Sequence, residues 1–429
     1  MKAFLFLGTA LLISAGIVLA GNEDLPRTLA ELNRWYVEPP TGQNAATIIL
    51  EATAALRITD ADSNSLSLPR IGNVQLPQPD KPIPADMKAA ITEFIQRNEP
   101  ALGLFGQAAQ FQQSRYPIDL NQGKSVLLPH LLKLKQAAKI LELSSVSHAV
   151  AGQSGEAGDD LLTSFALARS LESEPVLISQ LVRVACDSIA VDALEQILNR
   201  ITLSTHTLDQ LQDSLRQYEA REAMGLGFTR AFVGEQVSDL SAFEMAPDQY
   251  LTVPDNATPE ERKKFEIEIM ETMKMDRNYC QTTFDRALAL RSRPFPGRLS
   301  QDVFAEAEIA ATNKNLRLSC LFFAALDAIA PKEAGDLANL RLAQTAIALE
   351  KFRSDHANRY PDALTELTPN YLPSVPADPF DGKPLRYRKT GEGYVLYSIG
   401  RNLKDDGGKP GHGMEGDIVF SVISPPPAS

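Results

Sequence analysis

Apolar residues recur at helical spacing along most of the chain, most clearly between residues 176 and 198. Two apolar stripes follow two faces of this segment when it is drawn as a helix. The first stripe contains Ile178, Val182, Ala185, Ile189, Ala193 and Ile197, and the second contains Leu177, Leu181, Val184, Val191, Leu194 and Leu198. A helix that is apolar on two faces must be covered on both, so this pattern predicts a helix inside a helical array.

Start signals mark further helices. Thr258-Pro259-Glu260-Glu261 combines an N-cap residue, a proline at the first helical position and a glutamate that can reach back to the cap. Thr207, followed by Gln210, repeats this signal. The predicted helices cover residues 45–56, 86–98, 126–151, 156–171, 174–201, 207–223, 258–290 and 300–328. No fixed period relates them, so we expect an irregular antiparallel helical array rather than a named repeat fold.

The pattern changes after residue 336. Leu342, Ala346, Leu349 and Phe352 form one face of a helix that ends near His356. Alternating apolar residues then predict strands at 385–389, 394–399 and 417–422, the first two joined by the glycine-containing link "TGEG". The expected fold is therefore mainly α, with a small C-terminal α+β unit in which one helix covers a three-stranded antiparallel sheet.

Prolines and composition divide the rest of the chain. Residues 22–85 are interrupted by proline and predict an N-terminal arm with one helix. The sequence further predicts a helical domain at residues 86–330, the α+β domain at residues 337–424 and a loose tail at residues 425–429.

Residues 1–21 place Lys2 before an uncharged apolar run that ends in small residues, which is typical of an export signal. The run is also long enough for a retained membrane anchor, and in both cases we expect the body of the protein outside the cytoplasm.

Charge and cysteine content narrow the classes of partner. The formal net charge of -12 and the absence of a Lys and Arg cluster argue against a nucleic-acid partner, because such binding depends on gathered positive charge. Any membrane contact is expected through an uncleaved N-terminal segment alone. Cys186, Cys280 and Cys320 lie far apart within helical patterns, so we expect packed thiols rather than a disulfide framework or a zinc site.

The C-terminal fifth of the chain carries several motifs in a fixed order. They are Asn358 to Pro361, Asp378-Pro379 with Gly382, Pro384 and Tyr387, Ser398 to Gly400, and an Asp- and Gly-rich loop from Asp405 to Asp417. In this order they resemble the globular domain of the major pseudopilins of type II secretion. That resemblance implies the α+β fold, a calcium ion in the acidic loop and protein partners in the cell envelope. The N-terminus lacks the prepilin peptidase site of that family, so we do not expect assembly into a pilus.

The acidic loop is the one candidate metal site. Asp405 and Asp406 are adjacent, and Asp417 returns at the start of the last strand. Gathered carboxylates repel one another unless a cation offsets their charge, and calcium accepts six to eight oxygen ligands in flexible geometry. The alternative is a solvated turn, since Asp-Asp-Gly-Gly is good turn sequence without any metal.

Catalytic motifs are weak throughout. The "GKS" of residues 123–125 lacks the first glycine of a phosphate-binding loop, and no histidine lies in a metal motif such as His-Glu-x-x-His. For His130, which follows Pro129, a role at a helix start is the better interpretation. We therefore expect a non-catalytic, exported helical scaffold or interaction protein that ends in a pseudopilin-like domain. The alternative is an exported hydrolase whose active site lies in a groove of the helical domain.

Overall fold

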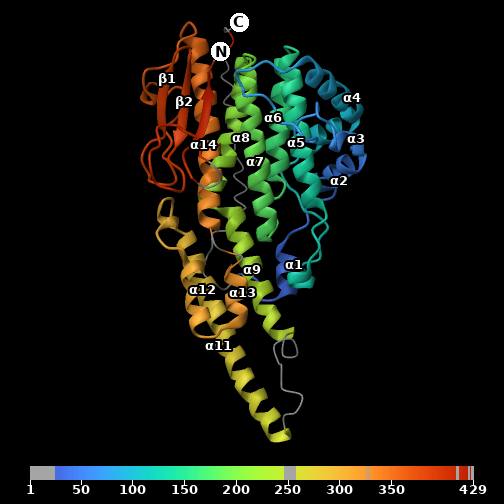
Figure 1. Cartoon of the computed structure of the whole chain (residues 1–429), viewed down its shortest axis with the longest axis vertical. Helices are drawn as coiled ribbons and strands as arrows, with labels where there is room; N and C mark the ends of the chain where they lie inside the picture. The colour runs from blue at the N-terminus through green and yellow to red at the C-terminus, as the bar shows by residue number, and fades with distance from the viewer. Residues whose placement is uncertain are drawn as a thin grey trace, which may run out of the picture.

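The computed structural model describes residues 25–245, 258–324, 326, 328–411, 415–423 and 426. These residues form an elongated, mainly helical molecule that carries a small sheet at one end (Figure 1). The predicted export signal at residues 1–21 lies outside the described residues, as does most of the predicted tail at residues 425–429. Within the described ranges, no helix is both long enough and apolar enough to span a bilayer.

Long helices run side by side through the upper part of the molecule (Figure 1). They are α4 (Ala85–Ala108), α5 (His130–Val150), α6 (Ser154–Arg169), α7 (Leu177–Leu198), α8 (Thr205–Met224) and α14 (Ile329–Asp355). The N-terminal arm adds α1 (Leu29–Trp35), α2 (Ala45–Ala55) and α3 (Asp60–Ser63). The lower part contains α9 (Leu226–Met245), α11 (Pro259–Arg291), α12 (Val303–Asn313) and α13 (Arg317–Ala324). Short 3-10 turns are η1 (Leu120–Ser125), η2 (Gly297–Leu299) and, in the C-terminal unit, η3 (Leu364–Leu367). This arrangement confirms the mainly helical fold class.

Helix boundaries differ from the predictions where local signals were ambiguous. The capping box of Thr258 and Glu261 is present as predicted, but α8 is capped by Ser204, whose hydroxyl accepts the backbone N–H of Thr207. The single helix predicted over 300–328 was wrong, because the chain turns at Asn315, which has a positive φ, and again at Ala328. Helix α14 then runs through residues 331–336, which lie between the predicted helical domain at 86–330 and the predicted α+β domain at 337–424.

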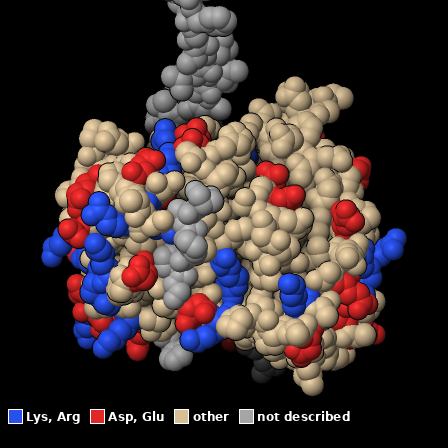
Figure 2. Space-filling view, turned by 90° about the horizontal axis from the view of Figure 1, so that it is seen from above, with Lys and Arg blue, Asp and Glu red and all other residues tan. Residues whose placement is uncertain are grey.

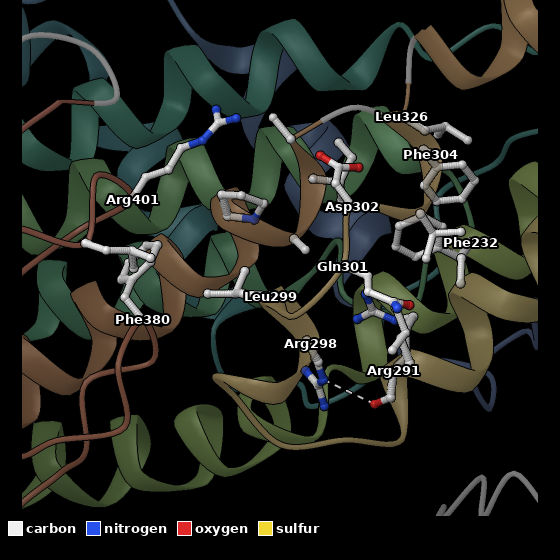
Figure 3. A pocket seen from close by; sticks show the side chains of 18 residues that line it. Phe232, Arg291, Arg298, Leu299, Gln301, Asp302, Phe304, Leu326, Phe380 and Arg401 are labelled. Carbon is white, nitrogen blue, oxygen red and sulfur yellow. Dashed lines mark hydrogen bonds between the residues drawn. The ribbon is translucent and has the colours of Figure 1, made fainter. Parts of the chain in front are cut away.

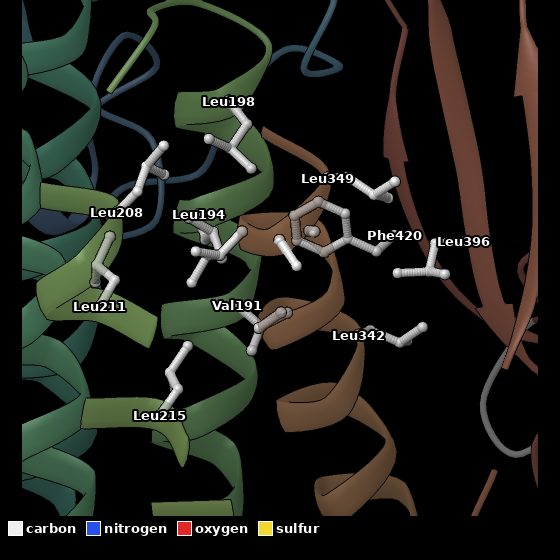
Figure 4. Close-up of a cluster of buried hydrophobic side chains, with 14 of the residues drawn as sticks. Val191, Leu194, Leu198, Leu208, Leu211, Leu215, Leu342, Leu349, Leu396 and Phe420 are labelled. Atoms are coloured by element: carbon white, nitrogen blue, oxygen red, sulfur yellow. The ribbon is translucent and has the colours of Figure 1, made fainter. Parts of the chain in front are cut away.

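Helix α7 is covered on several sides, as its two apolar stripes predicted. It packs against α5 and α6 on one side and against α14 and α9 on the other. Val191, Leu194 and Leu198 are buried in one continuous cluster with Leu208, Leu211 and Leu215 of α8 (Figure 4). Ile178 is the exception, because it lies in the first turn of the helix and is exposed.

The C-terminal sheet joins this same cluster. Its strands β1 (Arg386–Thr390), β2 (Gly393–Ser398) and β3 (Ile418–Val422) are antiparallel in the order β1-β2-β3, which confirms the predicted unit. Leu396 of β2 and Phe420 of β3 point toward Leu342 and Leu349 of α14 (Figure 4). The core of the helical array and the core of the α+β unit are therefore one hydrophobic core.

Side chains from the end of α7 cover the open edge of β3. Asn199 donates from Nδ2 to the carbonyl of Ser421 at 2.9 Å and accepts the N–H of Ile423 at 2.8 Å. Glu195 accepts the N–H and the hydroxyl of Ser421 at 2.7 and 2.8 Å. A sheet edge with unpaired N–H and C=O groups is open to pairing with other chains. Here the helical array supplies the missing partners.

Replacing Asn199 by alanine is expected to lower the free energy of unfolding by about 2 kcal/mol, because two backbone groups of β3 lose their partners. Urea unfolding of the full chain measures this change. Asn278→Ala, at an exposed position of α11, is the control and is expected to change stability by less than about 0.5 kcal/mol. Equal effects of the two substitutions would contradict the role of Asn199.

Candidate ligand-binding cavities

Arg183 is a large, charged side chain with no exposed surface. It comes from α7, and its guanidinium donates to Gln180 at 2.8 Å, to the Tyr218 hydroxyl at 2.9 Å and to Glu222 at 2.8 Å. Asp336 of α14 lies 3.5 Å from the same group. A buried charge is tolerated when it is paired and hydrogen-bonded, and the partners of Arg183 come from three helices. The pairing therefore fixes α7, α8 and α14 relative to one another.

Burial also shifts the acids around Arg183. It raises the pKa of Glu222 to about 8 and that of Asp336 to about 6, and it raises the pKa of Asp187 well above its ordinary value. One carboxylate oxygen of each of these residues is buried without a hydrogen-bond partner. At neutral pH the cluster therefore retains protons that the same residues lose in the unfolded chain.

A second buried cluster lies next to the first. Arg291 of α11 donates to Glu333 at 2.7 and 3.0 Å, and Arg298 of η2 donates to the same carboxylate at 2.9 Å. Gly225, at the left-handed C-cap of α8, lies against this group; a Cβ there would stand 2.5 to 2.7 Å from Arg298, Glu333 and Arg291. We call this cluster the arginine wall. Two guanidinium groups share one carboxylate in it, so it carries one net positive charge.

Phe228 of α9 links the two clusters. Its ring centroid lies 5.5 Å from the guanidinium carbon of Arg183 and 5.9 Å from that of Arg291. The negative face of an aromatic ring attracts cations, so one ring stabilises a charge on each side. The arginine wall is thus held by the same core that holds Arg183.

A cavity of about 250 Å³ opens on one side of the arginine wall, at the junction of the helical array and the C-terminal unit (Figure 3). We call it the junction cavity. Phe232, Phe304 and Leu326 lie on one side of it, Phe380 and Arg401 lie on the other, and Leu299 lies between them. Most of its remaining described lining is apolar, and Asp302 is the one acidic residue in that described lining.

Asp378 positions the C-terminal side of the junction cavity. It is fully buried, and its carboxylate accepts the N–H of Phe380 at 3.0 Å, the hydroxyl of Ser398 at 2.8 Å and the N–H of Ile399 at 2.9 Å. Arg386 of β1 donates to it at 2.6 Å. The Asp-Pro and Ser-x-Gly motifs of the sequence therefore meet at one carboxylate, and that contact holds Phe380 against Ala334 and Ala338 of α14.

A second cavity, of about 370 Å³, opens on the other side of the arginine wall. We call it the Trp35 cavity. Its described lining residues are Trp35, Ala223, Met224, Leu226, Thr229, Arg230, Val233, Arg291, Ser292, Pro294 and Arg298. No acidic residue is among them, whereas three arginines are.

The predicted calcium ligands are placed as follows. Asp417 is buried and accepts backbone N–H groups from Asp406, Gly408 and Lys409. Asp405 accepts the Tyr397 hydroxyl at 3.0 Å, and Asp406 accepts from Asn402 at 2.9 Å. Within the described residues, no group of three or more acidic, histidine or cysteine side chains could hold a metal ion. Protein donors occupy these carboxylates, and calcium at this loop stays a prediction from the sequence.

Other predicted positions have structural partners. His130 begins α5, as expected, and its Nε2 lies 3.1 Å from both oxygens of buried Glu174, which also accepts the Ser179 hydroxyl at 2.5 Å. The serine bonds the glutamate rather than the histidine, so the order of a nucleophilic triad is absent from this group.

Cys186, Cys280 and Cys320 are free thiols. On the face seen in Figure 2, the described acidic and basic side chains are interspersed.

No protein-family model, curated protein or solved structure matches this chain. The pseudopilin resemblance and the envelope partners that it implies therefore stay predictions.

Sequence reasoning missed Arg183, Arg230, Arg291 and Arg298. A charged residue between the two apolar stripes of α7 was the available signal for Arg183, because a helix covered on several sides must bury it.

Stability is expected to fall as pH rises from about 5 to about 8, by on the order of 2 kcal/mol. The buried carboxyls have folded-state pKa values above their unfolded values, as for Glu222 at about 8 and Glu142 at about 7, so the native state binds more protons within this window. The pKa of His148, raised by its hydrogen bond to Asp160, acts in the same direction. Carboxyls with a lowered pKa, such as Asp381, change the stability of the protein only below about pH 5.

Urea unfolding at several pH values measures this dependence, and Glu222→Gln should make it shallower. Greater stability at about pH 8 than at about pH 5 would show that the buried acids are ionised at little cost.

Proposed function

We propose that this protein is a non-catalytic binding protein whose junction cavity takes a small, largely apolar ligand. The observation that carries the proposal is the origin of the cavity walls. Phe232, Phe304 and Leu326 come from the helical array, whereas Phe380 comes from the C-terminal unit. Ligand pockets are commonly concave, mostly apolar sites at the boundary between parts of a protein, with a few polar groups that orient the ligand.

The polar groups of the junction cavity lie together at the arginine wall. Arg291 and Arg298 line the cavity beside Gln301 and Asp302, and both arginines are held by Glu333. Fixed side chains require little ordering when a ligand binds, so less free energy is lost. The junction cavity is polar at the arginine wall and apolar elsewhere, so it matches a ligand with one polar end and an apolar body of modest size. Its apolar body would lie between the phenylalanine rings.

The sequence predicted a non-catalytic interaction protein, and this proposal agrees with that prediction and adds the junction cavity as the binding site. Export, partners in the cell envelope and calcium in the acidic loop rest on the sequence, and the proposed binding does not require them. The alternative hydrolase would need convergent acidic or histidine side chains in a deep pocket. Asp302 is the one acidic residue in the described lining of the junction cavity, which also holds no histidine and is otherwise apolar apart from Gln301 and three arginines; this favours binding over acid and base chemistry.

The neutral dye N-phenyl-1-naphthylamine tests the junction cavity, because its fluorescence rises in apolar surroundings. We expect saturable binding to the native full chain and a raised melting temperature, since a ligand that binds only the native state stabilises it. Leu299→Trp places a larger side chain between the two walls and should weaken binding roughly tenfold or more. Leu321→Trp, at a residue that is 65% exposed on α13, is the matched control.

Binding that survives Leu299→Trp unchanged would place the dye elsewhere and overturn the proposal. The same conclusion follows if the native chain does not bind the dye. Circular dichroism and urea unfolding of both variants separate loss of the cavity from loss of the fold.

A further inference from the structure

Arg230 is a charged residue in the lining of the Trp35 cavity. It lies on α9, half-buried, and its guanidinium N–H groups reach no acceptor in the described part of the chain. Its guanidinium carbon lies 5.9 Å from the ring centroid of Trp35. Burial lowers the pKa of Arg230 below its ordinary value, which is the sign of a charge that is desolvated without full compensation.

The carboxylates near Arg230 are engaged by other arginines. Glu172 accepts from Nε of Arg221 at 2.8 and 3.0 Å. Glu333, within the arginine wall, accepts from both Arg291 and Arg298. Three arginines therefore line the Trp35 cavity, and the carboxylate of Glu333 offsets part of the charge of two of them.

We propose that the Trp35 cavity binds a small organic anion, with its carboxylate or phosphate group at Arg230 and its flat apolar body against Trp35. A planar guanidinium matches the two oxygens of a carboxylate or phosphate in a bidentate contact. The cavity, at about 370 Å³, lies within the usual size range of small-molecule sites. This site is separate from the junction cavity, so it does not depend on the proposed function.

The charge arrangement also explains how selectivity arises. A neutral molecule of the same shape would cover the half-buried guanidinium of Arg230 without accepting from it, whereas an anion supplies an acceptor. Sites built around an unsatisfied polar group discriminate strongly against ligands that lack the matching group. The structural role of Arg230 is correspondingly small, because its removal breaks no hydrogen bond within the described residues.

Trp35 provides a direct readout, because it is the one tryptophan of the chain. Titration of the full chain with phenyl phosphate, benzoate, inorganic phosphate and neutral benzyl alcohol is followed by tryptophan fluorescence and melting temperature. We expect phenyl phosphate or benzoate to change the fluorescence saturably and to raise the melting temperature. The relative affinities of these two probes distinguish a phosphate from a carboxylate ligand. Benzyl alcohol is expected to do neither at the same concentration.

Arg230→Gln should weaken binding of the aromatic anion roughly tenfold or more while leaving the melting temperature of the free protein unchanged or higher. Arg230→Lys keeps the charge without the planar fork and should bind with intermediate affinity. Arg169→Gln is the matched control, since Arg169 is also half-buried with its pKa lowered by burial but does not line this cavity. It should bind like the native chain.

Absence of binding by both aromatic anions, or equal binding by Arg230→Gln, would overturn the site. Binding of inorganic phosphate as tight as that of phenyl phosphate would overturn the role of Trp35. A large loss of stability in ligand-free Arg230→Gln would show that Arg230 has a structural role and would likewise overturn the proposal.

Discussion

The fold depends on one buried guanidinium, that of Arg183. Moving an isolated charge from water into the interior costs far more than the net stability of a typical domain, so the charge must be met by acids and hydrogen-bond acceptors. Those partners come from α7, α8 and α14, which are far apart in the sequence. Helices with smooth apolar faces could slide along one another, whereas a helix carrying Glu222 or Asp336 has one position in which its carboxylate meets Arg183.

Helix α14 extends this constraint to the C-terminal unit. Its first turns carry Glu333 and Asp336 into the buried charge clusters, and its later turns carry Leu342 and Leu349 into the core beneath the sheet. A straight helix transmits position along its length, so the charges that fix its beginning also fix the sheet that covers its end. The first turn of α14 lines the junction cavity with Ile329, Ala330 and Pro331, so the same helix supports the cavity and the C-terminal unit that closes it.

The sequence predicted what periodicity and capping can specify. The two stripes of α7, the capping box of Thr258 and the alternation in the three strands all correspond to observed elements, because each depends on residues close together in the chain. The positions of Arg183, Arg291 and Glu333 could not be predicted in this way. The place of Arg183 between two apolar stripes indicates that it is buried, but its acidic partners Glu222 and Asp336 lie tens of residues away, and local patterns do not show which acids meet it. The candidate site was missed for that reason.

Two kinds of buried charge can therefore be distinguished in this protein. Arg183, Arg291 and Arg298 have carboxylate partners from the chain itself: Arg183 pairs with Glu222 and Asp336, and the other two arginines share Glu333. Arg230 lies over the ring of Trp35, but its partly desolvated charge has no hydrogen-bond acceptor within the described residues. Interactions that destabilise the free protein are found more often at functional sites than elsewhere. This argument supports the Trp35 cavity as a second binding site beside the junction cavity, because at Arg230 the missing acceptor must come from outside the described chain.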